Sequence, residues 1–526
     1  MIFSCVPTNF SIFAFSQLPE HMKKIQQTIL FYLICFSFSA FAQNSDKKPD
    51  EKPVSLQPVP APVETKGQVT IGGQVINYTT RTGYMVLKDE AGKPKANIFF
   101  IAYTRDGVSD VAKRPITYTF NGGPGSASVW LHMGCIGPKR IPMSDKGESL
   151  APPYSYVNNE YSWLDKTDLV FIDPVNTGYS RAVQGENERQ FLGYNEDIES
   201  VGEFIRLHAT KYGRWGSPKF LAGESYGTTR AAGLSGYLQD KYNMYINGVA
   251  LISSILNFQT ALFDKGNDLP FELFLPTYTA MAWYHKKIAP EYQADLQKTL
   301  REVEKFVLNE YATILMKGDL ASDAEKEMVT DKLSKFTGLS KEFIRRANNR
   351  VEIFRFVKEL LRTEGKTVGR LDGRFTGTDY DNAGERYEFD PSLDATISGP
   401  YSGTINQYLR QELKYENDLP YLILTGRVHP WNYNNVQNKY LNVSETLRQA
   451  MSKNPYLKVW VAAAYYDLAT PYFAAEYTFN HMMLRPEQKK NVNFTYFESG
   501  HMMYIHKESL IKLKKDADKF YETALK

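Results

Sequence analysis

The chain has 526 residues, of which 43% are hydrophobic and 23% are charged, and its formal net charge is +3. These values are ordinary for a globular protein, and the length allows one large elaborated domain or two to three average ones. Because the net charge is so small, we expect no nucleic-acid partner.

The N-terminal residues have the pattern of an export signal. Met22-Lys23-Lys24 precedes an apolar stretch over residues 28–38, and Ala40-Phe41-Ala42 follows as a small-x-small cleavage site. We therefore expect a signal region over 1–42, with the true start at Met22 and cleavage after Ala42. The apolar stretch is too short to span a bilayer, so we expect no stable membrane insertion after signal removal.

Cysteine use agrees with bacterial export. Cys5 and Cys35 lie in the segment that would be removed, and Cys135 alone remains, so the mature chain has no internal disulfide. Together with the Met-Lys-Lys start, this indicates a bacterial periplasmic or secreted protein. Residues 43–66 are rich in proline and charge, and we expect them to form an extended linker.

From residue 67 onward, short apolar runs alternate with amphipathic ones. We expect strands at 68–76, 83–88, 96–104, 116–120 and 169–173, a helix at 195–212, a strand ending at 220–222 and a helix at 228–242. This alternation predicts an α/β fold with a mostly parallel central sheet.

The stretch 260–400 differs from its surroundings. It is rich in Lys, Glu and Leu and has helical periodicity at 295–317, 324–335 and 352–361, so we expect a helical cap insertion. Strand patterns return at 457–462 and 492–497, and an amphipathic helix is expected at 507–525. The fold core would then comprise 67–259 and 401–526.

A nucleophile motif lies between the strand ending at 222 and the helix starting at 228. Gly223-Glu224-Ser225-Tyr226-Gly227 fits the pattern G-x-S-x-G, in which a serine is held on a tight strand-to-helix turn. The glycines are needed because side chains there would collide with the neighbouring strand and helix. The motif predicts an α/β-hydrolase fold with Ser225 as nucleophile.

Two downstream residues complete a candidate triad. A serine nucleophile needs a base, and the base needs an orienting carboxylate, in the chain order Ser, acid, His for this fold. Asp467 follows the strand expected at 457–462, and His501 follows the strand expected at 492–497. We therefore expect Asp467 and His501 to act with Ser225.

A glycine-rich loop, Asn121-Gly122-Gly123-Pro124-Gly125, follows the strand at 116–120. Such a loop can direct backbone N–H groups at a developing oxyanion, and the amide of Tyr226, after the nucleophile, would be the second donor. The loop has no Gly-Lys-Ser/Thr of a phosphate site. The remaining histidines show no metal-ligand spacing, so we expect neither a metal nor a cofactor.

With these motifs the chain resembles the serine carboxypeptidases. Four segments are similar to motifs of that family: Asn121–Ser128 to N-G-G-P-G-C-S-S, Asn159–Trp163 to N-P-Y-S-W, Leu169–Ser180 to L-F-L-D-x-P-x-x-x-G-[FY]-S, and Gly223–Tyr226 to G-E-S-Y. Asp467 and His501 fall where the family places its other triad members, and the family carries a helical cap in the middle of the chain.

The resemblance implies a role for each site residue. Ser225 would attack the peptide carbonyl, His501 would relay the proton, and Asp467 would orient His501. The amides of Gly123 and Tyr226 would form the oxyanion hole. Asn121, the Gly122 amide and Glu224 would hold the C-terminal carboxylate of the peptide. Glu224 can donate a hydrogen bond to a carboxylate only when protonated, which favours peptide cleavage at acidic pH.

The sequence departs from the family at two positions near the site. Ser126 stands where the family has a disulfide-forming cysteine. Cys135, in Cys135-Ile136-Gly137-Pro138, stands where the family has E-L-G-P, whose glutamate partners the carboxylate-binding glutamate. One member of that carboxyl pair is therefore absent here.

Other readings of the same motifs remain open. An aminopeptidase that removes N-terminal proline, an esterase or an acyltransferase could use the same fold and triad, and a binding protein without activity could use the scaffold alone. Glu224 beside the nucleophile and Asn121 in the glycine loop favour recognition of a carboxylate. The intact triad favours an enzyme over a binding protein without activity.

Overall fold

The computed structural model describes residues 59–526, so the expected signal region at 1–42 and residues 43–58 of the expected linker lie outside the described residues. Ten strands of the described residues form the main sheet. They are β1 Val63–Ile71, β2 Gln74–Lys88, β3 Pro94–Arg105, β4 Ile116–Phe120, β7 Asp168–Ile172, β8 Arg181–Ala182, β9 Lys219–Ser225, β10 Gly248–Ser254, β13 Lys458–Ala464 and β14 Val492–Phe497.

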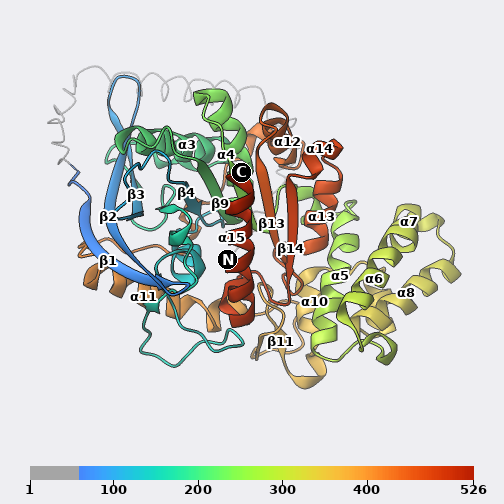
Figure 1. The fold of residues 1–526 in the computed structure, drawn as a ribbon. Coiled ribbons are helices and arrows are strands. Elements are labelled where there is room, and N and C mark those ends of the chain that lie inside the picture. Colours follow the sequence, from blue (N-terminus) through green and yellow to red (C-terminus); the bar gives the residue numbers. More distant parts are fainter. Residues whose placement is uncertain (1–58) are drawn as a thin grey trace, which may run out of the picture. The chain divides into compact units, whose positions relative to one another are not determined.

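The main sheet is mostly parallel, as the sequence predicts. Its strand order is β1-β2-β3-β7-β4-β9-β10-β13-β14, with β8 paired to β3 (Figure 1). Strands β7, β4, β9, β10, β13 and β14 run parallel to one another, whereas β1, β2 and β3 form an antiparallel extension at one edge. Two small sheets pair β5 Lys139–Arg140 with β6 Val157–Asn158, and β11 Thr367–Val368 with β12 Thr376–Gly377.

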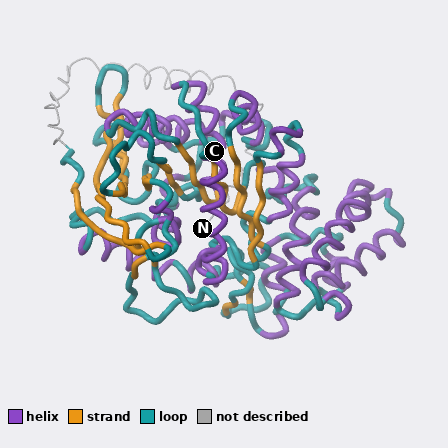
Figure 2. Tube along the Cα trace, viewed as in Figure 1, coloured by secondary structure: helices purple, strands orange, loops and turns teal. Residues whose placement is uncertain are grey.

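Helices cover both faces of the parallel strands, because successive side chains of a buried strand point to opposite faces. In β9, Leu221 packs in one apolar cluster with α3 Tyr194–Lys211, α4 Tyr226–Tyr242 and α12 Ser444–Lys453. Its neighbours Phe220 and Ala222 pack in another with α11 Ser398–Gln411 and α15 Lys507–Ala524. Figure 2 shows the strands enclosed between these helices.

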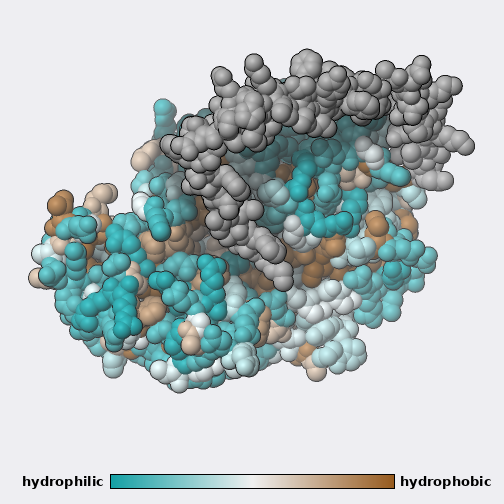
Figure 3. Space-filling view, turned by 180° about the vertical axis from the view of Figure 1, so that it is seen from behind, coloured by the Kyte–Doolittle hydropathy of each residue, from teal (hydrophilic) through white to brown (hydrophobic). Residues whose placement is uncertain are grey.

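A helical segment with its own apolar core follows β10. Its helices are α5 Leu269–Tyr284, α6 Leu296–Phe306, α7 Ala312–Lys317, α8 Asp323–Thr337, α9 Lys341–Arg346 and α10 Ile353–Glu359. They share an apolar cluster with α13 Tyr472–Asn480. At the outer tip of this segment the apolar residues Leu308, Met316 and Leu320 are exposed, and brown residues mark that tip in Figure 3. Within residues 59–526 the remaining α-helices are α2 Val129–Leu131 and α14 Pro486–Lys489.

The expected strand over 68–76 is wrong. β1 ends at Ile71 and β2 begins at Gln74, with Gly72 and Gly73 between them at φ values of 56° and 80°. Glycine adopts positive φ freely, so the pair forms a tight hairpin turn that the apolar pattern alone does not reveal.

Two expected boundaries also differ from the structure. β1 begins at Val63, inside the linker expected over 43–66, because residues 63–66 pair with the far end of the long strand β2. The helices of the expected cap insertion (260–400) end with α10 at Glu359 and a short turn at 362–364. The stretch that follows, up to α11, is mainly irregular and includes β11 and β12. Its conformation is set by contacts with distant loops, which helical periodicity cannot register.

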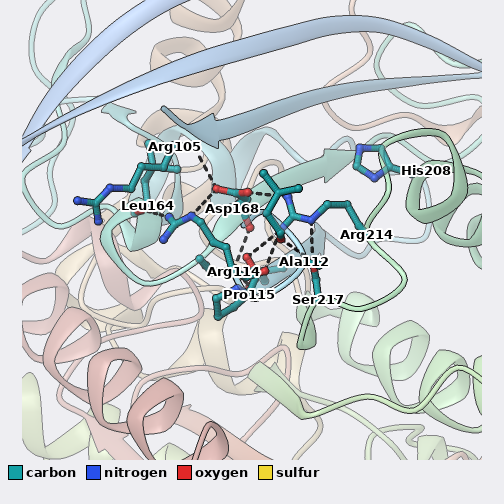
Figure 4. Close-up of polar contacts among 12 residues, drawn as sticks. Arg105, Ala112, Arg114, Pro115, Leu164, Asp168, His208, Arg214 and Ser217 are labelled. Atoms are coloured by element: carbon teal, nitrogen blue, oxygen red, sulfur yellow. Dashed lines mark hydrogen bonds and ion pairs between the residues drawn. The ribbon is translucent and has the colours of Figure 1, made fainter. Parts of the chain in front are cut away.

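A buried ion cluster lies at the amino ends of the parallel strands (Figure 4). Asp168, the first residue of β7, accepts from Arg114 Nε at 2.7 Å and from Arg214 Nη1 at 2.6 Å. Arg214 also donates to the carbonyl of Arg114 and, through Nε, to Ser217 Oγ. These residues directly precede or begin β4, β7 and β9, so the cluster ties together the starts of three neighbouring strands.

Candidate active site

The candidate site lies at the opposite, carboxyl ends of the strands. Asn121 directly follows β4, and Ser225 is the last residue of the neighbouring strand β9. The chain passes from β4 to β7 on one side, whereas β9 lies on the other side of β4. Such a divergence leaves a crevice at the carboxyl ends of parallel strands, where loops from both sides converge.

Ser225 sits on a tight turn between β9 and α4, with φ 61° and ψ −130°. Residues with a Cβ rarely adopt this conformation, so the surrounding structure must impose it. A Cβ on Gly223 would lie 2.1 Å from the carbonyl oxygen of Gly227, and one on Gly227 would lie 2.8 Å from that of Phe120. The two glycines are therefore required for the turn to close.

Asp467 and His501 form a buried hydrogen-bonded pair. His501 Nδ1 lies 2.8 Å from Asp467 Oδ2. Asp467 Oδ1 accepts from the amides of Ala469 and Thr470 at 2.8 and 3.1 Å, and Thr470 Oγ1 donates to Oδ2 at 2.7 Å. These four contacts fix the carboxylate, which accepts from Nδ1 and so leaves Nε2 of a neutral imidazole as a base.

The His501 backbone is held from two sides. Its amide donates to the carbonyl of Leu371 at 2.6 Å, and Ser253 Oγ donates to its carbonyl at 2.6 Å. Burial disfavours the imidazolium, but the charge and the hydrogen bond of Asp467 outweigh burial, so the pKa of His501 is raised. The imidazolium that forms during proton transfer is thus stabilised.

The glycine loop after β4 approaches the nucleophile turn closely. A Cβ on Gly122 would lie 2.4 Å from the Tyr226 nitrogen, and Gly123 has φ 102°. The side-chain Oδ1 of Asn121 accepts from the Leu131 amide at 3.1 Å. Its Nδ2 is buried and has no hydrogen-bond partner among the described residues. A buried amide group without a partner is costly, so this atom is suited to a ligand.

A buried ion pair holds the backbone of the glycine loop after β4. Arg230 of α4 donates from Nε to Asp197 Oδ2 of α3 at 2.7 Å, and both side chains are at most 2% exposed. Nη1 of the same guanidinium donates to the backbone carbonyl of Asn121 at 2.5 Å. The pair therefore links two helices to the loop that faces Ser225.

Glu224 is buried directly before the nucleophile. Tyr504 donates its hydroxyl to Glu224 Oε2 at 2.6 Å. Burial raises the pKa of Glu224 to about 7, and the Asp467 charge adds to the shift, while the His501 charge and the Tyr504 hydrogen bond oppose it. Glu224 is therefore a neutral acid below about pH 7, with Oε2 occupied by Tyr504 and Oε1 left to hold the proton.

Cys135 lies in the same buried cluster. It belongs to a π-helical turn, His132–Ile136, which Asn159 holds by donating from Nδ2 to the carbonyls of Cys135 and Gly137, both at 2.7 Å. Burial, followed by the negative charge of Glu224, raises the pKa of the Cys135 thiol well above its usual range. Cys135 is thus a neutral neighbour of Glu224.

The predicted residues come together around one cavity of about 480 Å³. Those that line it are Asn121, Gly122, Gly123, Glu224, Ser225, Tyr226 and His501. Asp467 lies behind His501 and is fully buried. A serine, an oriented imidazole and convergent backbone amides are the groups required for nucleophilic acyl transfer.

Sequence reasoning missed two residues. Tyr504, in the 3-10 turn Met503–Ile505 after His501, is the hydrogen-bond donor to Glu224. The sequence signal for Tyr504 was Cys135, which stands where the family has the glutamate that pairs with the carboxylate-binding glutamate. Without that partner, buried Glu224 needs a hydrogen-bond donor from another part of the chain. Arg370 lines the cavity from the irregular stretch after α10. No local pattern marks it, because only tertiary contacts bring it to the site.

Comparison with known proteins agrees with this geometry. The family model described as serine carboxypeptidase matches residues 71–511. Carboxypeptidase Y of Saccharomyces cerevisiae is 30% identical over 151 residues, which are 28% of this chain and 25% of that protein. Serine carboxypeptidase-like 36 of Arabidopsis thaliana is 25% identical over 177 residues, 33% of this chain and 34% of that protein. The chain thus spans only a quarter to a third of these relatives.

The structural similarity covers more of the chain than the sequence similarity does. The crystal structure of KEX1ΔP, a prohormone-processing carboxypeptidase from Saccharomyces cerevisiae, superposes with a TM-score of 0.50 at 15% identity. The match covers 85% of this chain and 91% of that one. The fold class predicted from the sequence is confirmed, and the chain belongs to the serine carboxypeptidase family.

Proposed function

We propose that this protein is an exported bacterial serine carboxypeptidase, which removes C-terminal residues from peptides through an acyl-enzyme. Its site residues would be Ser225, Asp467 and His501 as triad, with the amides of Gly123 and Tyr226 as the oxyanion hole. The observation that carries the proposal is Glu224, a buried carboxyl group next to the nucleophile and on the wall of the same cavity.

The reaction would proceed in two halves. His501 Nε2 takes the proton of Ser225 Oγ as that oxygen attacks the carbonyl carbon of the last peptide bond, and the two amides hold the oxyanion. His501 then gives the proton to the leaving nitrogen, so that the C–N bond breaks and the C-terminal residue departs. Water, activated by the same imidazole, hydrolyses the acyl ester and restores the Ser225 hydroxyl.

Recognition of the free C-terminus would rest on three groups. Protonated Glu224 donates from Oε1, Asn121 donates from the Nδ2 that has no partner among the described residues, and the Gly122 amide donates beside them. Donors without acceptors are what a carboxylate needs, whereas an ionised Glu224 would repel it. This set distinguishes a carboxypeptidase from an aminopeptidase, an esterase or an acyltransferase.

The proposal also includes a cap over the core and export from a bacterial cell. The helices and the irregular stretch within 260–400 would form a cap on the core of 67–259 and 401–526. Arg370, Leu371, Leu393 and Ile397, which all line the cavity, support this role. Export is supported by the signal pattern ending at Ala42, and a bacterial source by the absence of cysteine pairs from the sequence after it.

The test is mass spectrometry of a mixed peptide library after incubation with the protein, with Ser225→Ala as control. We expect products shortened by one residue at the C-terminus, and none with the variant. Shortening at the N-terminus, or cleavage confined to esters, would refute the carboxypeptidase proposal. Products formed equally by Ser225→Ala would refute the nucleophile.

A further inference from the structure

Arg370 lies on a segment that is anchored to both loops of the proposed triad. The segment, residues 369–374, lies in the connection between β11 and β12. The amide of Leu468, next to Asp467, donates to the Arg370 carbonyl at 3.0 Å, and the His501 amide donates to the carbonyl of Leu371 at 2.6 Å. The position of the Arg370 backbone relative to Ser225 is therefore as fixed as that of the triad.

Arg370 brings a charge to the cavity that is permanent. Among the described residues lining the cavity, the charged or titratable side chains are Glu224, Tyr226, Arg370, His429 and His501, and burial keeps the Tyr226 phenol neutral by raising its pKa. Glu224 is neutral below about pH 7 because burial raises its pKa, whereas a guanidinium is charged at every physiological pH. At acidic pH the lining of the cavity therefore carries the permanent positive charge of Arg370 and no permanent negative charge.

The Arg370 guanidinium is only weakly engaged by its neighbours. Asp390 forms an ion pair with it, in which the buried Oδ2 lies 3.9 Å from Nε, beyond hydrogen-bond distance, while Asp390 Oδ1 accepts from the Arg370 amide and from Ser392. The Tyr387 phenol beside it stays neutral because burial raises its pKa. The Arg370 side chain is 30% exposed, so donors remain available to a ligand.

We propose that Arg370 makes the enzyme selective for peptides with an acidic side chain next to the scissile bond. The inference rests on the proposed carboxypeptidase function and adds the substrate class. A planar guanidinium binds a carboxylate through two parallel hydrogen bonds, and apolar neighbours such as Leu371 and Leu393 strengthen the attraction by excluding water. A lysine or arginine side chain at the same place would be repelled.

The side-chain carboxylate that Arg370 would bind can belong to the residue that is released or to the residue before it. Two sets of N-blocked tripeptides separate these sources: one ends in Ala-Glu, Ala-Gln or Ala-Lys, the other in Glu-Ala, Gln-Ala or Lys-Ala. We expect kcat/KM to favour Glu over Gln by roughly 10-fold in one of the sets, which then identifies the position.

Three variants test whether Arg370 is responsible. In Arg370→Gln the preference for Glu over Gln disappears, and in Arg370→Glu it reverses so that Lys is favoured. Arg427→Gln, which removes an exposed arginine beside the lining residue Gly426, keeps the wild-type preference. Raising the salt concentration from 0.05 to 0.5 M should weaken the preference in the wild type, because a partly exposed pair is screened, and this measurement needs no variant to fold.

Each result decides the question. A wild type that cleaves Glu and Gln peptides equally overturns the inference, as does an Arg370→Gln variant that slows all six peptides by one factor, since Arg370 would then serve the α-carboxylate or the fold. If no free peptide is cleaved, the proposed function fails by itself. The ratio of hydrolysis of N-blocked Glu and Gln ethyl esters by wild type and Arg370→Gln then tests Arg370 separately.

Discussion

Glu224 sets the pH dependence of the proposed reaction at the scale of single residues. Its pKa is raised to about 7 by burial, so it is protonated and able to donate below that pH and is ionised above it. We expect kcat/KM for an N-blocked dipeptide with a free carboxylate to fall by about tenfold per unit as pH rises beyond 7. The amide of the same dipeptide should lack this alkaline decline.

The acidic limb should be common to both substrates. His501 accepts a proton only when neutral, and its pKa is raised by Asp467, so activity is lost as pH falls through that raised pKa. Stopped assays of dipeptide and amide between pH 4 and pH 9 compare the two limbs. Superimposable profiles would contradict the role given to Glu224.

Tyr504 should influence the pH at which activity on the free dipeptide declines. Its hydroxyl stabilises the ionised form of Glu224, so Tyr504→Phe removes a hydrogen bond to the charged form and raises the pKa of Glu224 by about one unit. The alkaline limb for the free dipeptide should move up by that amount, while the amide profile stays in place. Tyr401→Phe, a change in the same buried cluster, is the matched control. An unmoved limb in Tyr504→Phe would contradict this prediction.

At the scale of elements, the ion pair between α3 and α4 should matter for both stability and activity. Asp197→Asn leaves the buried Arg230 guanidinium uncompensated, which costs about 3–5 kcal/mol in the free energy of unfolding. It also loosens the carbonyl of Asn121, so activity per folded molecule should drop.

Urea unfolding followed by circular dichroism measures the first effect, and initial rates below the transition measure the second. Glu203→Gln on the same helix α3 is the control, because its pair with Arg206 is partly exposed and contributes little, and a glutamine side chain can still accept the hydrogen bond of the Tyr242 hydroxyl. If Asp197→Asn and Glu203→Gln unfold at the same urea concentration, the assigned role of the pair is wrong.

Local patterns predicted most elements well, for physical reasons that also explain the failures. β4, β14 and α15 were recognised because their apolar residues repeat with the period of a strand or a helix. The hairpin at Gly72-Gly73 is not found by the apolar pattern on its two sides, and only the glycine pair, whose positive φ closes the turn, marks it. Arg370 was missed because β11 and β12 are short, and their position depends on hydrogen bonds to the loops of Asp467 and His501.

At the scale of the whole molecule, stability and catalysis are assigned to opposite ends of one sheet. Asp168, between Arg114 and Arg214, joins the amino ends of three strands (Figure 4), whereas Ser225 is the last residue of β9. Asp168→Asn should lower the free energy of unfolding by about 3–5 kcal/mol. Its kcat/KM per folded molecule should equal that of the wild type.

Thermal unfolding and titration of active sites with a fluorophosphonate give the two quantities. Glu342→Gln, which alters an exposed pair with Arg346, should leave the unfolding midpoint unchanged. A loss of kcat/KM in Asp168→Asn that persists after correction for labelled sites would show that the two ends of the sheet are coupled.

The segment 369–374 has a consequence for how this protein can change over generations. Its backbone holds the loops of Asp467 and His501 by hydrogen bonds, while Arg370 and Leu371 line the cavity. Lengthening or shortening the segment would displace the imidazole, so selection removes such changes even when they would improve the pocket. Within this segment, a change of peptide preference would therefore come by exchange of side chains, with the main chain kept.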